Sequence, residues 1–154
     1  MQIRWIESPV QKEEISSRIL GLLPEWFGIP ESTAEYIRES QHMPFLALMD
    51  AEEPIGFLAL KRTSEAAAEI YVMGIAPAYH RLGGGRMLVE ASAGWCKEHA
   101  LAFLQVKTLD ASHPDPCYRR TRAFYKAMGF RPLECLPSLW GEENPCLIMI
   151  RTID

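Results

Sequence analysis

Residues 75–88, IAPAYHRLGGGRML, join the end of a strand pattern to the start of a helix pattern. Three consecutive glycines let the backbone approach a ligand closely, and the N–H groups in the first turn of a helix have no partner inside the helix. Such a turn binds anions, and Arg81 and Arg86 can add charge-assisted hydrogen bonds on either side. A pyrophosphate fits this description. The alternative is that the glycines only allow a sharp corner from strand to helix.

Two well-known phosphate loops do not match these residues. A P-loop requires Lys followed by Ser or Thr after the last glycine, whereas Arg86 and Met87 follow Gly85. A dinucleotide fingerprint requires a small residue three positions after its second glycine, where this chain has Leu88. Both nucleotide-binding interpretations are therefore excluded.

The segments around the turn alternate strand and helix patterns, which indicates an α/β fold with a mixed, mostly antiparallel sheet. Gly129 suits the left-handed position that ends a helix, with Phe130 behind it as the hydrophobic contact. Residues 26–28, Trp-Phe-Gly, form an aromatic loop between the first two expected helices. Strands are expected at residues 3–6, 45–49, 55–61, 68–76, 103–108, 130–135 and 146–153, and helices at 13–23, 30 to about 40, the glycine turn to about 98, and about 118–128.

The composition bounds the possible functions. The chain has 154 residues, of which 48% are hydrophobic, with 16 Lys and Arg against 20 Asp and Glu. A chain of this length can build one core without a disulfide or a metal, so we expect a single domain over residues 1–154.

The charge and the residue pattern argue against several classes of partner. The net charge of −4 lacks the basic excess that nucleic-acid binding requires. No apolar run approaches the roughly 20 residues that span a bilayer, so we expect a cytoplasmic protein without membrane contact. The irregular spacing of the four cysteines argues against a metal site.

Two motifs in the middle of the chain resemble the GNAT superfamily of acyl-CoA-dependent N-acyltransferases. The family's pyrophosphate signature, Gln/Arg-x-x-Gly-x-Gly/Ala, is similar to HRLGGG at residues 80–85, with His80 in place of Gln or Arg. A second signature, Phe-Tyr followed by Gly-Phe, is similar to FYKAMGF at residues 124–130. Together the motifs cover roughly residues 44–135, whereas residues 1–40 match only in the order of their elements.

The resemblance implies acetyl-CoA as the co-substrate and assigns its binding residues. In similar proteins the strand before the glycine turn splays from its neighbour and pairs with the pantetheine arm, and Met73, Gly74 and Ile75 occupy these positions. The alternative for Gly74 is a simple bulge in a core strand. Tyr118 stands where the family commonly has Asn. The remaining expected cofactor-binding residues are His80, Arg81, Leu82, Gly83, Gly84, Gly85, Arg86 and Phe124.

The resemblance also implies transfer of an acetyl group to a primary amine, by direct attack in a ternary complex. Neutralising an alkyl amine of pKa about 10.4 at pH 7 costs about 4–5 kcal/mol, so a carboxylate that takes the proton is needed. Glu69 is our candidate, and an exposed strand glutamate is the alternative. Tyr125 would protonate the departing thiolate, and the alternative is a core tyrosine. An N–H near Ile75 would bind the developing oxyanion.

We expect a small-molecule or peptide amine as the acceptor. A small-molecule amine, an aminoglycoside-like compound and a protein N-terminus or lysine all remain open, because the segment that shapes this pocket in similar proteins is the least recognisable part of the chain. Tyr36 and the aromatic loop at residues 26–28 are candidates for its walls. Other functions compatible with the sequence are transfer of a longer acyl chain, and an acyl-CoA-binding sensor or interaction module without turnover. Dimers are common among similar proteins, and the last strand with Trp140 offers an apolar surface for a homodimer.

Overall fold

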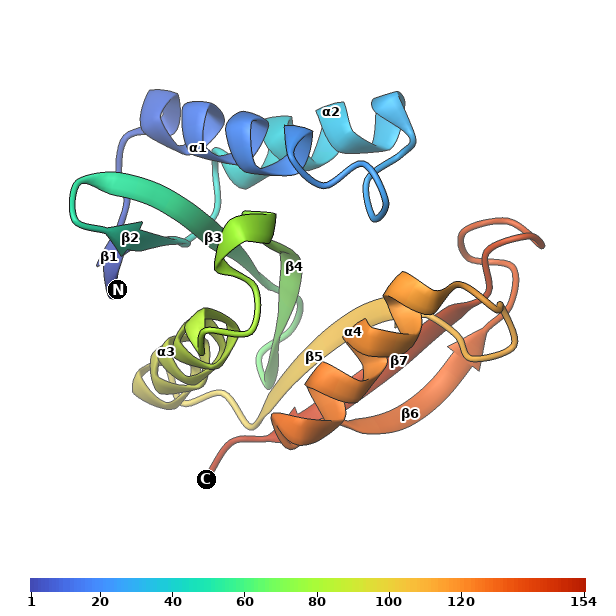
Figure 1. Ribbon diagram of the computed structural model, residues 1–154. Helices are drawn as coiled ribbons and strands as arrows, with labels where there is room; N and C mark the ends of the chain where they lie inside the picture. The colour runs from blue at the N-terminus through green and yellow to red at the C-terminus, as the bar shows by residue number, and fades with distance from the viewer. The chain divides into compact units, whose positions relative to one another are not determined.

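The computed structural model describes residues 1–154, and their elements alternate as expected (Figure 1). The chain divides into two compact units, of which the first holds Met1–Lys61 and Ile70–Trp95 and the second holds Arg62–Glu69 and Cys96–Asp154. The elements are β1 (Gln2–Trp5), α1 (Pro9–Gly21), α2 (Pro30–Ser40), β2 (Phe45–Asp50), β3 (Glu53–Arg62), β4 (Ala67–Ile75), the 3-10 helix η1 (Pro77–Tyr79), α3 (Gly84–Glu98), β5 (Phe103–Leu109), α4 (Pro116–Ala127), β6 (Arg131–Leu136) and β7 (Cys146–Thr152).

The first unit is built on strands β1 to β4, which lie in chain order. β2 pairs antiparallel with both β1 and β3, and a register shift interrupts the second pairing between Leu48 and Met49. Successive residues of β2 face opposite sides of the sheet. Phe45, Ala47 and Met49 belong to the cluster that includes α1, whereas Leu48 lies on the side of α3. Helices therefore cover both faces of these strands.

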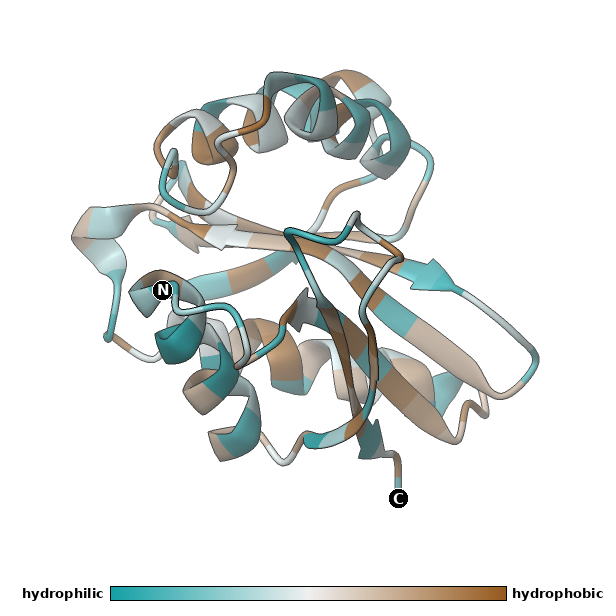
Figure 2. Ribbon diagram, turned by 90° about the vertical axis from the view of Figure 1, so that its right-hand side faces the viewer, coloured by the Kyte–Doolittle hydropathy of each residue, from teal (hydrophilic) through white to brown (hydrophobic).

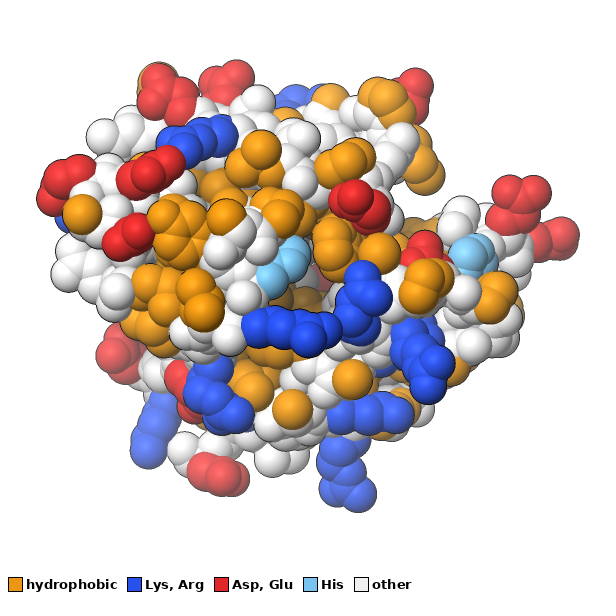
Figure 3. Space-filling view, viewed as in Figure 1, with side chains coloured by type: hydrophobic (Ala, Val, Ile, Leu, Met, Phe, Trp, Pro, Cys, Tyr) orange, Lys and Arg blue, Asp and Glu red, His pale blue; other side chains and the backbone are white.

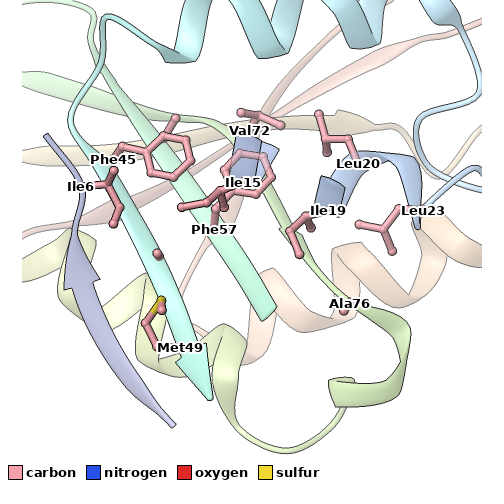
Figure 4. Close-up of a cluster of buried hydrophobic side chains, with 12 residues drawn as sticks. Ile6, Ile15, Ile19, Leu20, Leu23, Phe45, Met49, Phe57, Val72 and Ala76 are labelled. Atoms are coloured by element: carbon pink, nitrogen blue, oxygen red, sulfur yellow. The ribbon is translucent and has the colours of Figure 1, made fainter. Parts of the chain in front are cut away.

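A cluster of buried hydrophobic residues lies between α1 and the strands of the first unit (Figure 4). Phe45 and Phe57 stack with their ring centroids 5.2 Å apart, and Ile19 and Leu20 of α1 are almost fully buried against the strands. Figure 2 shows strands drawn largely in the hydrophobic colour, whereas α1 and α2 mix hydrophobic and hydrophilic positions. That mixture is typical of helices with one face toward a core.

Helix α1 begins at Pro9 and ends at Gly21, so the expected range of 13–23 is wrong at both ends. The Ser8 side chain accepts a hydrogen bond from Gln11 N–H, and Pro9 occupies the first helical position, where a missing N–H costs nothing. The local capping signal therefore decides where the helix starts, four residues before the segment with clear apolar periodicity.

The second unit contains β5, β7 and β6, which lie side by side in that order and pair antiparallel. Ala102 and Phe103 donate N–H bonds to the carbonyl of Ala66, so β5 starts beside the start of β4 and runs in the same direction. Helix α4 is capped by Asp115, whose side chain accepts hydrogen bonds from two N–H groups of the first turn. Gly129 has φ +91°, which confirms the expected left-handed helix end.

The strand order over the chain is β1-β2-β3-β4-β5-β7-β6. β5 starts parallel to β4, whereas β2 pairs antiparallel with β1 and β3, and β7 pairs antiparallel with β5 and β6. These pairings confirm the expected α/β fold with a mixed, mostly antiparallel sheet. None of the helices has the length and hydropathy needed to cross a membrane.

Candidate active site

In the first unit, the end of β4 brings Met73, Gly74 and Ile75 next to the glycine turn. Helix α1 packs so closely on Gly74 that a Cβ there would lie 2.9 Å from Leu23 Cδ1 and 3.1 Å from Ile19 Cγ2. Close helix packing therefore explains why this position is a glycine. Met73 and Ile75 are half-buried. Their backbone contact with a pantetheine arm stays a prediction.

The segment that follows β4 is short and is held by a backbone hydrogen bond. Ala76 donates its N–H to Ile55 O at 2.8 Å, and η1 follows immediately. Arg81 has φ +63° and Gly83 has φ +89°, so two left-handed residues turn the backbone into α3. Glycine adopts this region without steric cost, whereas a residue with a Cβ is strained there.

The first turn of α3 presents N–H groups that the helix itself does not use. The first intrahelical bond runs from Met87 N–H to Gly83 O, so the N–H groups of Gly84, Gly85 and Arg86 have no intrahelical acceptor. A Cβ on Gly83 would meet nothing within 4 Å, whereas a Cβ on Gly84 would lie 2.4 Å from Leu48 Cδ2. The turn is thus open toward solvent at one glycine and pressed against β2 at the next.

The charges around this turn favour an anion. Arg81 and Arg86 are exposed and form no ion pair, and the helix dipole adds about 0.3–1 kcal/mol for a negative group at this end. Leu82 is also exposed. Unused N–H donors, open space at Gly83 and two free guanidinium groups fit a pyrophosphate.

His80 braces the strand end from within the turn. Its Nε2 lies 2.6 Å from Ile75 O, and because a carbonyl oxygen only accepts, Nε2 carries the proton. The ring also stands edge-on to Trp26, with centroids 5.8 Å apart. His80 therefore ties the aromatic loop at residues 26–28 to the end of β4.

The remaining aromatic residues expected near an acceptor lie together in the same unit. The rings of Phe27 and Tyr36 are 5.9 Å apart, those of Tyr36 and Tyr71 are 5.3 Å apart, and the Lys61 ammonium lies 5.8 Å from the centroid of Tyr71. The face of Tyr71 therefore already attracts a cation within the protein.

In the second unit, Glu69 is buried in an ion pair, so the alternative of an exposed strand glutamate is wrong. Its carboxylate lies 3.0 Å from Lys107 Nζ, and its side chain is 7% exposed whereas that of Lys107 is 29% exposed. Charge-assisted hydrogen bonds of this kind fix the position of both groups. Sequence reasoning missed Lys107, although a lysine within the apolar strand segment FLQVKTL is a signal of a partner.

Tyr125 lies on α4 among aromatic rings. It is 5% exposed, and its ring centroid lies 5.3 Å from that of the half-buried Phe124 and 5.4 Å from that of Phe130. Burial raises the pKa of Tyr125 well above the usual value of a phenol, and the nearby Tyr118 raises it further. The hydroxyl therefore keeps its proton at neutral pH.

The predicted residues fall into two groups. Residues 73–75 and 80–86 lie together in the first unit, whereas Glu69, Tyr118, Phe124 and Tyr125 belong to the second. Tyr118 and Tyr125 are seven residues apart on α4 and share one helix face. Within the second unit no hydrogen bond joins Glu69 to Tyr125.

A comparison with models of known protein families identifies the family of this chain. Residues 10–130 match the model of the acetyltransferase (GNAT) family. No curated protein sequence matches the chain.

Solved structures match over nearly the whole chain. A GNAT-family protein from Desulfovibrio desulfuricans has 19% identity and a TM-score of 0.84, covering 99% of both chains. An aminoglycoside 6'-N-acetyltransferase complexed with coenzyme A has 20% identity and a TM-score of 0.76, covering 100% of this chain and 98% of its own. The ribosomal-protein-S18-alanine N-acetyltransferase of Escherichia coli has 19% identity and a TM-score of 0.68, covering 99% of this chain and 94% of its own. At these identities the likeness concerns the fold.

Proposed function

Because this chain belongs to the GNAT acetyltransferase family, we propose that it transfers the acetyl group of acetyl-CoA to a primary amine, by direct attack in a ternary complex. The family uses acetyl-CoA as its acetyl donor, and residues 1–154 are proposed to work as one N-acetyltransferase domain. The observation that carries the proposal is the α3 turn, whose unused N–H groups and exposed arginines fit a pyrophosphate.

The chemistry assigned to Tyr125 and Glu69 follows from the needs of amide formation. A buried phenol that stays protonated can supply the proton that the departing thiolate needs. A carboxylate held in place by Lys107 can take the amine proton, directly or through water. Either function contributes typically 10²–10⁴-fold to the rate of a proton-transfer step.

The helices of the first unit support a cationic acceptor. Residues 7–40 hold seven glutamates and three basic residues, so this segment carries a net charge of −4, equal to that of the whole chain. Figure 3 shows acidic side chains prominent over α1 and α2. A surface of one sign attracts ligands of the opposite sign and does so less at high ionic strength.

The solved structures with related folds are compatible with both a small-molecule and a peptide acceptor. One is named for an aminoglycoside and another for the alanine of a ribosomal protein, so a small-molecule amine and a peptide amine are both compatible with this fold. We infer a positively charged amine in either case, because the acidic segment itself contains the aromatic residues Phe27 and Tyr36, whose rings meet edge to face.

Isothermal titration of acetyl-CoA and of CoA into the purified chain tests the cofactor site. We expect micromolar binding to the unchanged chain and its loss in Gly83→Asp, because a carboxylate would then stand in the open space of the turn. Gly94→Asp is the control for an added carboxylate on α3, since Gly94 also has nothing within 4 Å of its Cβ position, although it lacks the left-handed φ of Gly83. If the unchanged chain binds neither compound, the proposed function is wrong.

Thiol release with a panel of amines then tests the reaction, and mass spectrometry of the product tests for an amide. Tyr125→Phe and Glu69→Gln should each lower kcat by about 10²-fold or more while acetyl-CoA still binds. Binding of acetyl-CoA without turnover on any amine would instead identify an acyl-CoA-binding sensor.

A further inference from the structure

A cavity lies in the first unit, away from the glycine turn. It has a volume of about 350 Å³, and its walls include Trp5, Lys12, Met43, Phe45 and Trp95. This volume is within the range of about 300–1,000 Å³ of pockets that bind small molecules. No step of the proposed acetyl transfer uses these residues.

The pairing of the strands separates this cavity from the turn. Phe45 pairs with Ala59, whereas Gly56, three residues earlier on β3, lies against Gly74 and Ile75. Three residues of strand correspond to about 10 Å. Figure 4 shows the same separation, with Ile6 and Phe45 at one end of the cluster and Leu23 and Ala76 at the other.

A buried ammonium group lines the cavity without an ionic partner. Lys12 is only 7% exposed, and its Nζ donates one hydrogen bond, to Met43 O at 2.7 Å. An ammonium has three donors, and no carboxylate lies within ion-pair distance of this one. A buried charge without a partner is costly, so a lysine in this position indicates that an anion completes the site.

The position of Lys12 in its helix points to the same conclusion. Lys12 lies in the first turn of α1, a turn that contains no acidic residue. The positive end of the helix dipole favours an anion and disfavours a lysine. A bound negative group would offset both the helix end and the buried ammonium.

The other walls define the body of the ligand. The lining includes the aromatic residues Trp5 and Trp95, the apolar residues Met43 and Pro44, and the exposed residues Glu7 and His42. We propose that this cavity binds a small organic carboxylate with an aromatic body, the carboxylate against Lys12 and the ring against the lining that includes Trp5 and Trp95.

Phenylacetate and phenylacetamide, titrated into the full chain and followed by saturation-transfer NMR, test this proposal. The two probes have nearly the same shape and differ in charge. Phenylacetate should bind at least 10-fold more tightly, and Lys12→Met should remove this difference. Lys97→Met is the control, because Lys97 is exposed near the end of α3 and is not part of the cavity. Equal binding of the two probes, or no binding of either, would overturn the proposal.

A second variant covers the case in which Lys12→Met does not fold. Trp5 is 42% exposed and is not part of the hydrophobic cluster beside α1, so Trp5→Ala should fold and should weaken phenylacetate binding several-fold. Gly83→Asp should bind phenylacetate as the unchanged chain does. Failure of the cofactor site would therefore leave this result unaffected, and the two proposals can be tested separately. Unchanged affinity in Trp5→Ala would argue against the cavity as the binding site.

Discussion

Two glycines of helix α3 stand in opposite environments. A Cβ on Gly84 would lie 2.4 Å from Leu48 Cδ2, and Leu48 is fully buried, whereas Gly94 has open space around it. The same substitution should therefore change stability in opposite directions at the two positions of one helix.

We expect Gly84→Ala to lower the free energy of unfolding by about 1–3 kcal/mol, because the added methyl group overpacks the interface with β2. Gly94→Ala should raise it by about 0.5–1 kcal/mol, because alanine loses less backbone entropy in an exposed helix. Urea denaturation of both variants measures the difference. A stabilised Gly84→Ala would contradict the close approach of α3 to Leu48.

The hydrogen bond from His80 to Ile75 fixes a tautomer. The neutral ring should carry its proton on Nε2, since only that nitrogen faces a carbonyl oxygen. Two-bond ¹H–¹⁵N correlation spectra of histidine-labelled protein distinguish the tautomers, and His80→Ala assigns the signal. A proton on Nδ1 would mean that His80 does not brace the strand end.

Among the elements, strands β4 and β5 are joined in the second unit by the ion pair of Glu69 and Lys107. Lys107→Met leaves the Glu69 carboxylate buried without its partner. Because Lys107 is partly exposed, the loss should be less than for a fully buried pair, about 1–3 kcal/mol in the free energy of unfolding.

The double variant Glu69→Gln/Lys107→Met should recover part of this loss, because it removes the uncompensated charge. Lys126→Met, at an exposed position of α4, is the control for loss of a positive charge. Urea denaturation of the unchanged chain, Glu69→Gln, Lys107→Met and the double variant completes the cycle, and Lys126→Met is measured beside them. If Lys107→Met and the control lose the same stability, the ion pair does not contribute.

At the scale of the whole molecule, buried thiols couple stability to alkaline pH. Burial raises the pKa of both Cys96 and Cys146 from 9.0 to about 11. Between pH 9 and 11 the unfolded chain therefore loses thiol protons that the folded chain keeps. The free energy of unfolding should fall as pH rises through this window and should not depend on these thiols below it.

Urea denaturation between pH 7.5 and 11 measures this dependence, and Cys96→Ala should reduce the slope. The buried phenol of Tyr125, whose pKa burial also raises, adds to the fall above pH 10. Stability that stays constant or increases from pH 9 to 11 would contradict the burial of these groups.

The sequence predicts those features of the fold that depend on neighbouring residues. Gly129 ends α4 as expected, because a left-handed residue followed by an apolar one is a local signal. The start of α1 also depends on a local signal, the capping residue Ser8 and the following Pro9. The apolar periodicity begins later and therefore predicts the wrong boundary. The shift in strand register at Leu48 and Met49 has no sequence signal that we recognise.

Features of the candidate site that depend on distant residues could not be predicted in this way. Lys107 is 38 positions from Glu69, and Met43 is 31 positions from Lys12, so both contacts arise only when the strands and helices pack. The glycine turn is predictable because its donors and its special φ angles belong to consecutive residues. The roles of Glu69 and Tyr125 in catalysis stay predictions, and their burial is what the structure adds.

The strand pairing within each unit also predicts how easily the backbone hydrogen bonds of each strand open to solvent. β7 pairs along its length with β5 on one side and with most of β6 on the other, whereas β1 has four residues and a single partner, β2. Amide protons at the centre of a sheet exchange with solvent only when a large part of it unfolds, whereas those at an edge exchange by local fraying. In deuterium oxide, the amides of Ile148 and Ile150 should therefore be among the last to exchange, long after those of β1.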